Sequence, residues 1–578
     1  MPGLLAAIWL LGLFAAAPLL RTSARYDFPD RLRDALVLGI AIPFALGFVH
    51  ALYAAACWGT LVLCIGGAQL RRGLATEPPS RDCASPVPYV LIASLVAVTW
   101  PQLMRPPLDG DSLSYHLPNA AAWVQAHSLW TTLTHYWWYP PASELFASAI
   151  YAVSGPFALP WCGFGALALL GFRVAAWARD GFGVPALLAD ALASASVTIY
   201  PIAIQGGTLQ NDVWLAAFFV ESLWSLRART RGTSATRTLA VTALIKPQGW
   251  ILALVALAAG KARRRLWLTT VAAIGIWVLH DALLWQNAAV APASTAHANL
   301  FGSTILAHGA GAFEELAAVA LRVSPFALVA LLAAFAAPAI ARREPLLRWS
   351  PFAAGLLFLM LPFGYATSVA QLATGASLRF AAPAIAAGAI VLAPYARRIG
   401  RVATALLLAS TAYGIWYVLA IFWNDGGTHV AIAFALLAVA VSALAHTQRV
   451  AWANAAAFAL AVIAAVHLAA RHPLDYYTDA LRAGPSPPGI YRWIARTRPA
   501  AVGGWGLRLG AVNVLSPLTR TMDLPDRDSC AQAQRRSAVL IAVAQNDLSS
   551  SANEQRLSAA RQCGVTLYAD ATAVAAAP

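Results

Sequence analysis

Long apolar runs, separated by short polar segments, extend from the start of the chain to about residue 470. Each run covers about 17–25 residues, the length that an α-helix needs to cross the hydrocarbon core of a bilayer. The runs are continuous and do not alternate with polar positions, which favours helices over the strands of a membrane barrel. The pattern therefore predicts an α-helical, polytopic membrane protein with about 13–16 transmembrane helices.

The polar segments indicate how these helices cross the membrane. Arginines gather in alternate segments, beginning with 21–33, and the positive-inside rule assigns such segments to the cytoplasmic side. Leu4–Leu20 has arginines only after it, so we expect a retained helix and not a signal peptide. Ala142–Ser154 is short for a span and is expected along the membrane interface. The other expected spans are 34–50, 51–70, 87–103, 157–178, 184–204, a run from 213, a hairpin broken near 246, 266–286, 316–340, 348–368, 380–396, 402–422, 429–446 and 450–470.

Composition agrees with this pattern and removes one class of partner. Hydrophobic residues make up 60% of the 578 residues and charged residues only 11%, against roughly a quarter in typical soluble domains. The net charge of +15 would suggest a nucleic-acid partner in a soluble protein. Here the topology of the arginine-rich segments explains the charge, so we expect no nucleic acid. High alanine and arginine with almost no lysine indicates a bacterial chain.

The chain changes character after its last apolar run. Gly489–Arg498 is expected to form a helix, while Ala538–Ala544 and Val565–Tyr568 have the composition of short strands. These elements predict a small α/β domain outside the membrane. Cys530 and Cys563 fall within it, either as a pair in an oxidising compartment or as two buried thiols.

The first long outer loop, residues 104–141, holds the first candidates for chemistry. Asp109 and Asp111 flank a glycine, and such carboxylates can converge on a cation or act as base and orienting group. Tyr115 and His116 follow about one helical turn later and share the face of Asp111. The alternative is an ordinary Asp-Gly turn, with Asp111 or Ser112 capping the helix that follows.

This loop and several later segments resemble the GT-C superfamily, the polyprenyl-phosphate-dependent glycosyltransferases that include protein mannosyltransferases and lipid A aminoarabinose transferases. The resemblance would make 87–470 the catalytic transmembrane domain, 1–86 additional helices and 471–578 a periplasmic α/β domain. It rests on the order, spacing and common side of Asp111 with Tyr115, Tyr139-Pro140-Pro141, Asn211-Asp212, Ile245-Lys246-Pro247 and Arg379-Phe380-Ala381-Ala382-Pro383.

The resemblance implies a reaction and a role for each charged residue. The superfamily transfers a sugar, with inversion, from a lipid phosphate to an acceptor hydroxyl or amine. Asp111 would then be the general base, with Asp109 assisting it or holding a divalent cation (Mg or Mn) together with Asp212. The leaving phosphate needs cations beside it, for which Lys246 and Arg379 are the candidates. Alternatively, Lys246 is a snorkelling anchor and Arg379 an anchor at the interface.

Four further residues are expected to contact the substrate or a cation, namely Tyr115, His116, Tyr139 and Glu144. Tyr139 either stacks on a sugar or lies at the membrane interface with the tryptophans before it. A histidine or glutamate at such positions is more often structural than catalytic.

The expected partners are a polyprenyl-phosphate-sugar donor, an acceptor in the cell envelope (glycan, lipid or protein) and the lipid bilayer. The expected location is the bacterial inner membrane, with the site on the periplasmic side. One alternative is a transporter or flippase, which usually shows internal repeats that this sequence lacks. Another is a polysaccharide polymerase or ligase, which differs in the lipid-linked donor that it uses.

Overall fold

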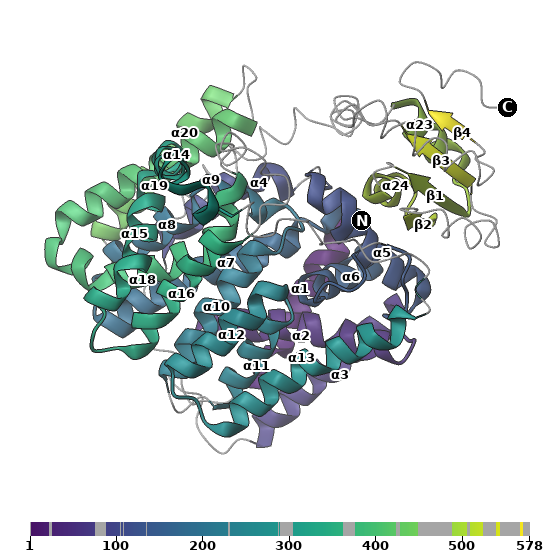
Figure 1. Cartoon of the computed structure of the whole chain (residues 1–578), viewed down its shortest axis with the longest axis horizontal. Coiled ribbons are helices and arrows are strands. Elements are labelled where there is room, and N and C mark those ends of the chain that lie inside the picture. The colour runs from purple at the N-terminus through teal and green to yellow at the C-terminus, as the bar shows by residue number, and fades with distance from the viewer. Residues whose placement is uncertain are drawn as a thin grey trace.

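The protein is a body of packed helices that carries a small α/β unit at one end (Figure 1). The computed structural model describes residues 2–21, 26–74, 88–103, 106–107, 109–134, 136–228, 232–286, 288, 304–361, 376–422, 428–448, 488–505, 509–523, 539–543 and 567–569. Within these ranges the predicted helical membrane fold is confirmed. The predicted span 450–470 and the two cysteines Cys530 and Cys563 lie outside the described residues.

Most of the described residues lie in helices. The first are α1 (Pro2–Ala16), α2 (Phe28–Phe48), α3 (Ala54–Leu74) and α4 (Tyr89–Leu103). The first outer loop contains η2 (Ser112–His116), α5 (Leu117–Ala126) and α6 (Ala142–Ser154). Then come α7 (Trp161–Ala176), α8 (Ala186–Val197), α9 (Tyr200–Ala203), α10 (Asp212–Arg227), α11 (Gly232–Ala243), α12 (Pro247–Ala259) and α13 (Arg264–Trp285).

The later helices complete the body. They are α14 (Gly309–Val323), α15 (Pro325–Ile340), α16 (Pro345–Met360), η7 (Ala376–Ala381), α18 (Ala382–Ile399), α19 (Arg401–Phe422) and α20 (Thr428–Gln448). Short turns of helix lie between these elements, at η1 (Ala17–Leu20), η3 (Pro156–Ala158), η4 (Trp177–Gly181), η5 (Ile204–Gly207) and η6 (Leu306–His308).

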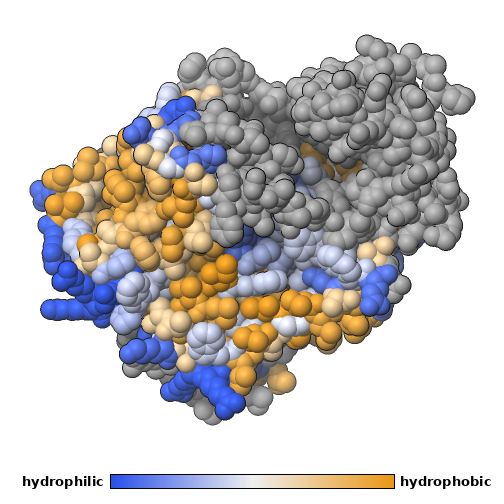
Figure 2. All heavy atoms as spheres, in the orientation of Figure 1, coloured by the Kyte–Doolittle hydropathy of each residue, from blue (hydrophilic) through white to orange (hydrophobic). Residues whose placement is uncertain are grey.

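Several of these helices are long and apolar enough to cross a bilayer. Within the described residues there are five, or six if the pair Ala186–Val197 and Tyr200–Gly207, bent by 80°, counts as one span. Five shorter apolar helices accompany them, so part of the predicted set is shorter than expected. Apolar side chains cover much of the helical surface, and hydrophilic ones gather toward its ends (Figure 2). The five full-length spans are Gly3–Leu20, Pro156–Gly181, Arg264–Trp285, Ser377–Ile399 and Arg401–Ala420.

The C-terminal unit combines helices and strands, as its sequence predicts, and its strands form one parallel sheet. Its four strands are ordered β2-β1-β3-β4, and each neighbouring pair is parallel. Parallel strands need a crossover on one face, and the helix α24 follows β1 directly. The unit consists of α23 (Pro488–Thr497), β1 (Ala501–Trp505), α24 (Leu509–Leu515), β2 (Arg520–Asp523), β3 (Val539–Val543) and β4 (Leu567–Ala569).

One local expectation proves wrong, and one predicted segment is more deeply buried than its sequence indicates. The sequence places Arg33 in a loop, but Asp27 accepts a hydrogen bond from the backbone N–H of Asp30 and starts α2 earlier. Arg33 is therefore buried inside the protein. The sequence also predicts that α6 lies along the interface and does not span; nearly all its side chains are buried, and it packs against α2 and α5. Its thirteen residues are too few to span, but their apolar surface is covered by protein.

A buried ion-pair network joins α2, α7 and α10. The Arg173 guanidinium lies 2.7 Å from Asp30 and 2.5 Å from Glu221. Arg33 lies 2.9 Å from both Asp30 and Asp34, and all five side chains are at most 3% exposed. Charges this deeply buried are tolerated only when they are paired, so the network fixes the relative positions of the three helices.

Replacing Arg173 with methionine should destabilise the protein strongly. The substitution leaves the Asp30 and Glu221 carboxylates without their main cation, and breaking a buried pair costs about 3–5 kcal/mol. Thermal unfolding in detergent measures the loss. Arg342→Met is the control, because Arg342 is exposed and donates a hydrogen bond to the nearby Ala339 carbonyl. Equal midpoints for the two variants would contradict the account.

The start of α4 is held from a distance by α8. Both carboxylate oxygens of Asp190 accept hydrogen bonds, from the backbone N–H groups of Val90 and Leu91, each at 2.9 Å. These N–H groups have no partner within their own helix, so a buried carboxylate satisfies them. The contact fixes the helix that delivers the first outer loop to the site.

Candidate active site

Asp111 lies at the start of a π-helical turn, η2, but its side chain does not cap that turn. The backbone N–H of Ser112 donates instead to the Asp109 carboxylate at 2.9 Å, and the Asp111 side chain makes no capping bond. The alternative in which Asp111 is the helix cap is therefore wrong. Asp109 does the capping, and Asp111 is free to point elsewhere. Single turns of this π type are frequent at functional sites.

Four charged side chains from separate parts of the chain meet in alternating order. The Arg379 guanidinium lies 2.6 Å from the Asp111 carboxylate and 3.6 Å from that of Asp212. The Lys246 ammonium donates to the other oxygen of Asp212. Two carboxylates and two cations thus form one chain of ion pairs, Asp111–Arg379–Asp212–Lys246, which we call the ion-pair chain. The structure brings together the four residues that the sequence placed on one side.

Lys246 owes its position to a break between two helices. It precedes Pro247, which has no N–H and begins α12, and its own backbone is extended. The two helices cross so closely that a Cβ on Gly249 would lie 2.0 Å from the Thr242 carbonyl oxygen. The side chain of Lys246 is only 7% exposed and reaches Asp212 from this break.

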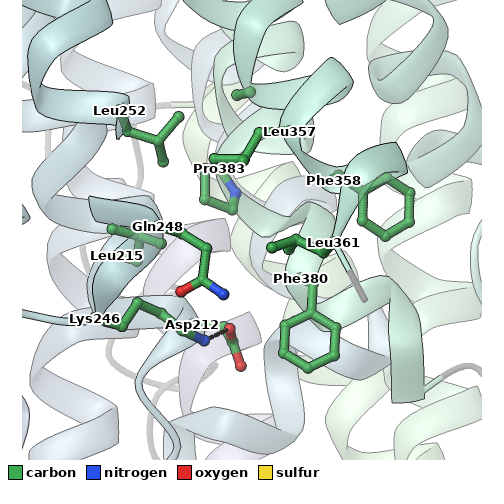
Figure 3. Close-up of a pocket in the computed structure, with 11 residues that line it drawn as sticks. Asp212, Leu215, Lys246, Gln248, Leu252, Leu357, Phe358, Leu361, Phe380 and Pro383 are labelled. Atoms are coloured by element: carbon green, nitrogen blue, oxygen red, sulfur yellow. Dashed lines mark hydrogen bonds and ion pairs between the residues drawn. The ribbon is translucent and has the colours of Figure 1, made fainter. Parts of the chain in front are cut away.

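An apolar opening begins at the Lys246 end of the ion-pair chain (Figure 3). It has a volume of about 280 Å³, counted with the solvent at its mouth. In Figure 3 Lys246, Asp212 and the Gln248 amide lie at one end, and Leu252, Leu357 and Pro383 at the other. The site therefore has a charged end joined to an apolar one. Its lining is Asp212, Leu215, Lys246, Gln248, Leu252, Ala354, Leu357, Phe358, Leu361, Phe380 and Pro383.

A cluster of aromatic rings lies within electrostatic reach of Asp111. The Tyr115 ring lies 4.6 Å from that of Tyr136 and 6.2 Å from that of Tyr139, and Trp138 stacks on Tyr139 at 4.6 Å. Burial raises the pKa of Tyr139 to about 12, so its hydroxyl stays protonated at neutral pH and can donate a hydrogen bond. Trp137 is buried, with its ring 6.0 Å from that of Trp285.

His116 and Glu144 are buried and paired with each other. The His116 Nδ1 lies 2.5 Å from a Glu144 oxygen, and the Ser143 hydroxyl donates to the second Glu144 oxygen at 2.8 Å. His116 Nε2 has no hydrogen-bond partner among the described residues. The pair comes from η2 and α6, so it connects the turn of Asp111 to a buried helix.

The described residues do not fit the divalent cation considered for Asp109 and Asp212. The two Asp212 oxygens face Lys246 and Arg379. One Asp109 oxygen accepts from Ser112 and from the Gln210 amide at 3.2 Å. No group of three or more His, Cys, Asp or Glu side chains in the described ranges is arranged to hold a metal ion. We therefore assign no step to a metal.

Sequence reasoning missed three residues of the site. Gln210 bonds Asp109, Gln248 lines the opening, and the Phe380 ring centroid lies 5.1 Å from the Lys246 nitrogen and 4.8 Å from the Arg379 guanidinium. Each lies one or two positions from a charged residue that the sequence did single out. Their closeness in sequence to predicted site residues was the only sign that they belong to the site. Polar and aromatic neighbours are too common for this sign to identify site residues by itself.

Asp109→Asn should leave the fold at least as stable as the wild type at pH 8. Burial, aided by the neighbouring Asp111 charge, raises the Asp109 pKa above its usual value. Such a group favours folding at low pH, and that contribution is lost as the pH rises through its folded pKa. Asparagine stays neutral and keeps an oxygen for Ser112 and Gln210. Unfolding midpoints between pH 4 and pH 8 measure this, and a variant distinctly less stable than wild type at pH 8 would contradict it.

Comparison with known proteins identifies the fold. No protein-family model matches the chain, and no curated protein sequence matches it significantly. Among solved structures, ArnT from Cupriavidus metallidurans bound to undecaprenyl phosphate matches with a TM-score of 0.50 at 17% identity, over 78% of this chain and 88% of that one. The same protein in the apo state matches with a TM-score of 0.46 at 15% identity, over 77% and 86%. The chain therefore shares the fold of ArnT, over most of the length of both proteins.

Proposed function

We propose that this protein is an inverting glycosyltransferase that moves a sugar from a polyprenyl phosphate to an extracytoplasmic acceptor. The observation that carries the proposal is the ion-pair chain at one end of an opening whose other end is apolar. A lipid phosphate has the same division, an anionic head on an apolar tail. The fold supports the proposal, because ArnT was crystallised with undecaprenyl phosphate, a lipid of this class.

The proposed reaction assigns one task to each charge. An acceptor hydroxyl or amine attacks the anomeric carbon and gives its proton to the Asp111 carboxylate. The bond from that carbon to the phosphate oxygen breaks, and its electron pair stays on the lipid phosphate. Lys246 and Arg379 stabilise the negative charge that grows there. Asp212 holds both cations in place before the donor arrives.

Arg379 also connects donor binding to the proposed base. Its guanidinium is paired with Asp111 at 2.6 Å, so the donor phosphate and the proposed base compete for the same cation. A phosphate that draws Arg379 toward itself releases Asp111 for the acceptor. Tyr115 and Tyr139, which both interact electrostatically with Asp111, are then the side chains on which the sugar would stack, and the His116–Glu144 pair connects the turn to α6.

Binding of undecaprenyl phosphate to the purified protein tests the proposal. We expect native mass spectrometry to show one lipid retained, and undecaprenol, which has the same tail without the phosphate, to be lost. Equal retention of the two lipids would show that the opening holds apolar chains without recognising a phosphate, and would contradict the proposal.

We also propose that the protein lies in a bacterial inner membrane, with the catalytic domain in 87–470 and the C-terminal α/β unit on the periplasmic side. The alternation of arginine-rich segments supports this orientation. An Arg520→Cys variant, in a chain whose six native cysteines are replaced, should react with a membrane-impermeant maleimide in intact cells. Labelling only after lysis would reverse the orientation.

A further inference from the structure

The C-terminal α/β unit is seated on the turn that carries Asp111. Helix α24 packs against η2 and α5, and Figure 1 shows α24 on the side of the unit that faces α5. Leu509 and Val512 of α24 are buried in the same apolar core as Leu113 and Leu117. The unit is thus continuous with the core beneath the site.

Gly510 makes the closest approach in this contact. A Cβ added at Gly510 would lie 2.6 Å from the Cα of Leu113 and 2.6 Å from its carbonyl oxygen. Both atoms belong to the backbone, so no side-chain rotation can relieve the overlap. Any other residue at this position must push η2 and α24 apart.

Hydrogen bonds from α5 and α6 hold the unit at a second place. The Gln125 amide donates to the carbonyl oxygens of Pro517 at 3.1 Å and Thr519 at 3.0 Å. The Tyr151 hydroxyl donates to the same Pro517 carbonyl at 2.9 Å. These bonds lie beyond α24 along the chain, so the unit is fixed against rotation as well as displacement.

The opposite side of η2 is attached to the segment before Asp212. The Ser112 hydroxyl accepts from the backbone N–H of Leu209 at 2.8 Å, and Gln210 donates to Asp109. The turn is therefore held between this segment and α24. Movement of α24 shifts Asp111 relative to Asp212 and to the Arg379 that joins them.

We propose that the C-terminal α/β unit positions the active site, and that Gly510 is the residue through which it sets the place of Asp111 and Tyr115. This inference rests on the proposed function. Misplacing a reacting group by about 1 Å lowers rates on the order of 10²-fold, and a methyl group at Gly510 requires a shift of about that size.

The test measures transfer by the full-length protein with Gly510→Ala. The probe is undecaprenyl phosphate carrying radiolabelled aminoarabinose or mannose, whichever the wild type transfers. We expect kcat to fall about 10- to 100-fold, with the donor KM within about threefold because Lys246 and Arg379 are untouched. Gly275→Ala in α13 is the matched control, since a Cβ there meets nothing within 4 Å.

A second variant, Gln125→Ala with Tyr151→Phe, removes the hydrogen bonds to Pro517 and Thr519 without adding an atom to the contact. It tests the inference even if Gly510→Ala does not fold. Hydrogen exchange of a peptide covering 109–118 should rise in this variant while kcat falls. Unchanged exchange and unchanged kcat would overturn the inference, as would faster exchange with wild-type kcat. If the wild type transfers no sugar, the proposed function fails, whereas exchange still reports whether the unit holds the turn.

Discussion

Asp111→Asn should lower the rate of sugar transfer about 10²- to 10⁴-fold, the range that a general base contributes. Asparagine has nearly the same size and keeps an oxygen toward Arg379, which lies 2.6 Å away, so the site stays assembled. It cannot accept the acceptor's proton. The expected loss is therefore in kcat, with donor binding nearly unchanged.

Asp109→Asn is the matched control for this variant. The residue lies two positions away and receives the same substitution, but one oxygen of its carboxylate accepts hydrogen bonds from Ser112 and Gln210, which an asparagine oxygen can also accept. We expect its transfer rate to stay within about threefold of wild type, well under the effect of removing a base. Equal losses in the two variants would mean that the loop needs negative charge in general, and wild-type transfer by Asp111→Asn would remove Asp111 as the base.

Lys246→Met should weaken the binding of undecaprenyl phosphate about 10- to 100-fold. A hydrogen bond to a charged group contributes about 1.5–3 kcal/mol, and tenfold in affinity is about 1.4 kcal/mol. Methionine fills the same space without the charge. Retention of undecaprenyl phosphate in native mass spectrometry, titrated over lipid concentration, measures the change.

The protein carries its own control for this prediction. Lys261 is the only other lysine in the sequence, and it lies exposed at the turn after α12. Lys261→Met removes the same charge far from the opening and should bind the lipid as wild type does. The double variant Asp212→Asn, Lys246→Met separates binding from folding, because it leaves no buried carboxylate without its lysine. A phosphate affinity restored in the double variant would contradict a direct role for Lys246.

The sequence predicts the membrane fold and the four charged residues for a simple reason. Each apolar run that is long enough to span can be recognised from its local sequence alone. Arginine-rich segments then indicate the direction in which each run crosses the membrane. Charged residues at the outer ends of those runs must then lie on one side. Asp111, Asp212, Lys246 and Arg379 all meet that condition, although their separation along the chain is large.

The partners of each residue could not be predicted. Local pattern does not say which helices are neighbours, so the position of Arg379 between two carboxylates appears only in the structure. The same holds for Arg33, which the sequence pattern places in a loop but which is buried and forms an ion pair with Asp30. The contact between Gly510 and Leu113 has no local signal either, because it depends on where a remote unit packs.

Sugar transfer by membranes containing the wild-type protein tests the central claim most directly. The membranes receive undecaprenyl phosphates with radiolabelled sugars, alongside membranes that contain Asp111→Asn at equal abundance. The account predicts that label moves from lipid to an envelope acceptor with wild type and not with the variant. Absence of transfer from every monophosphate-linked donor would contradict it and favour a transporter, or a polymerase or ligase that uses diphosphate-linked glycans.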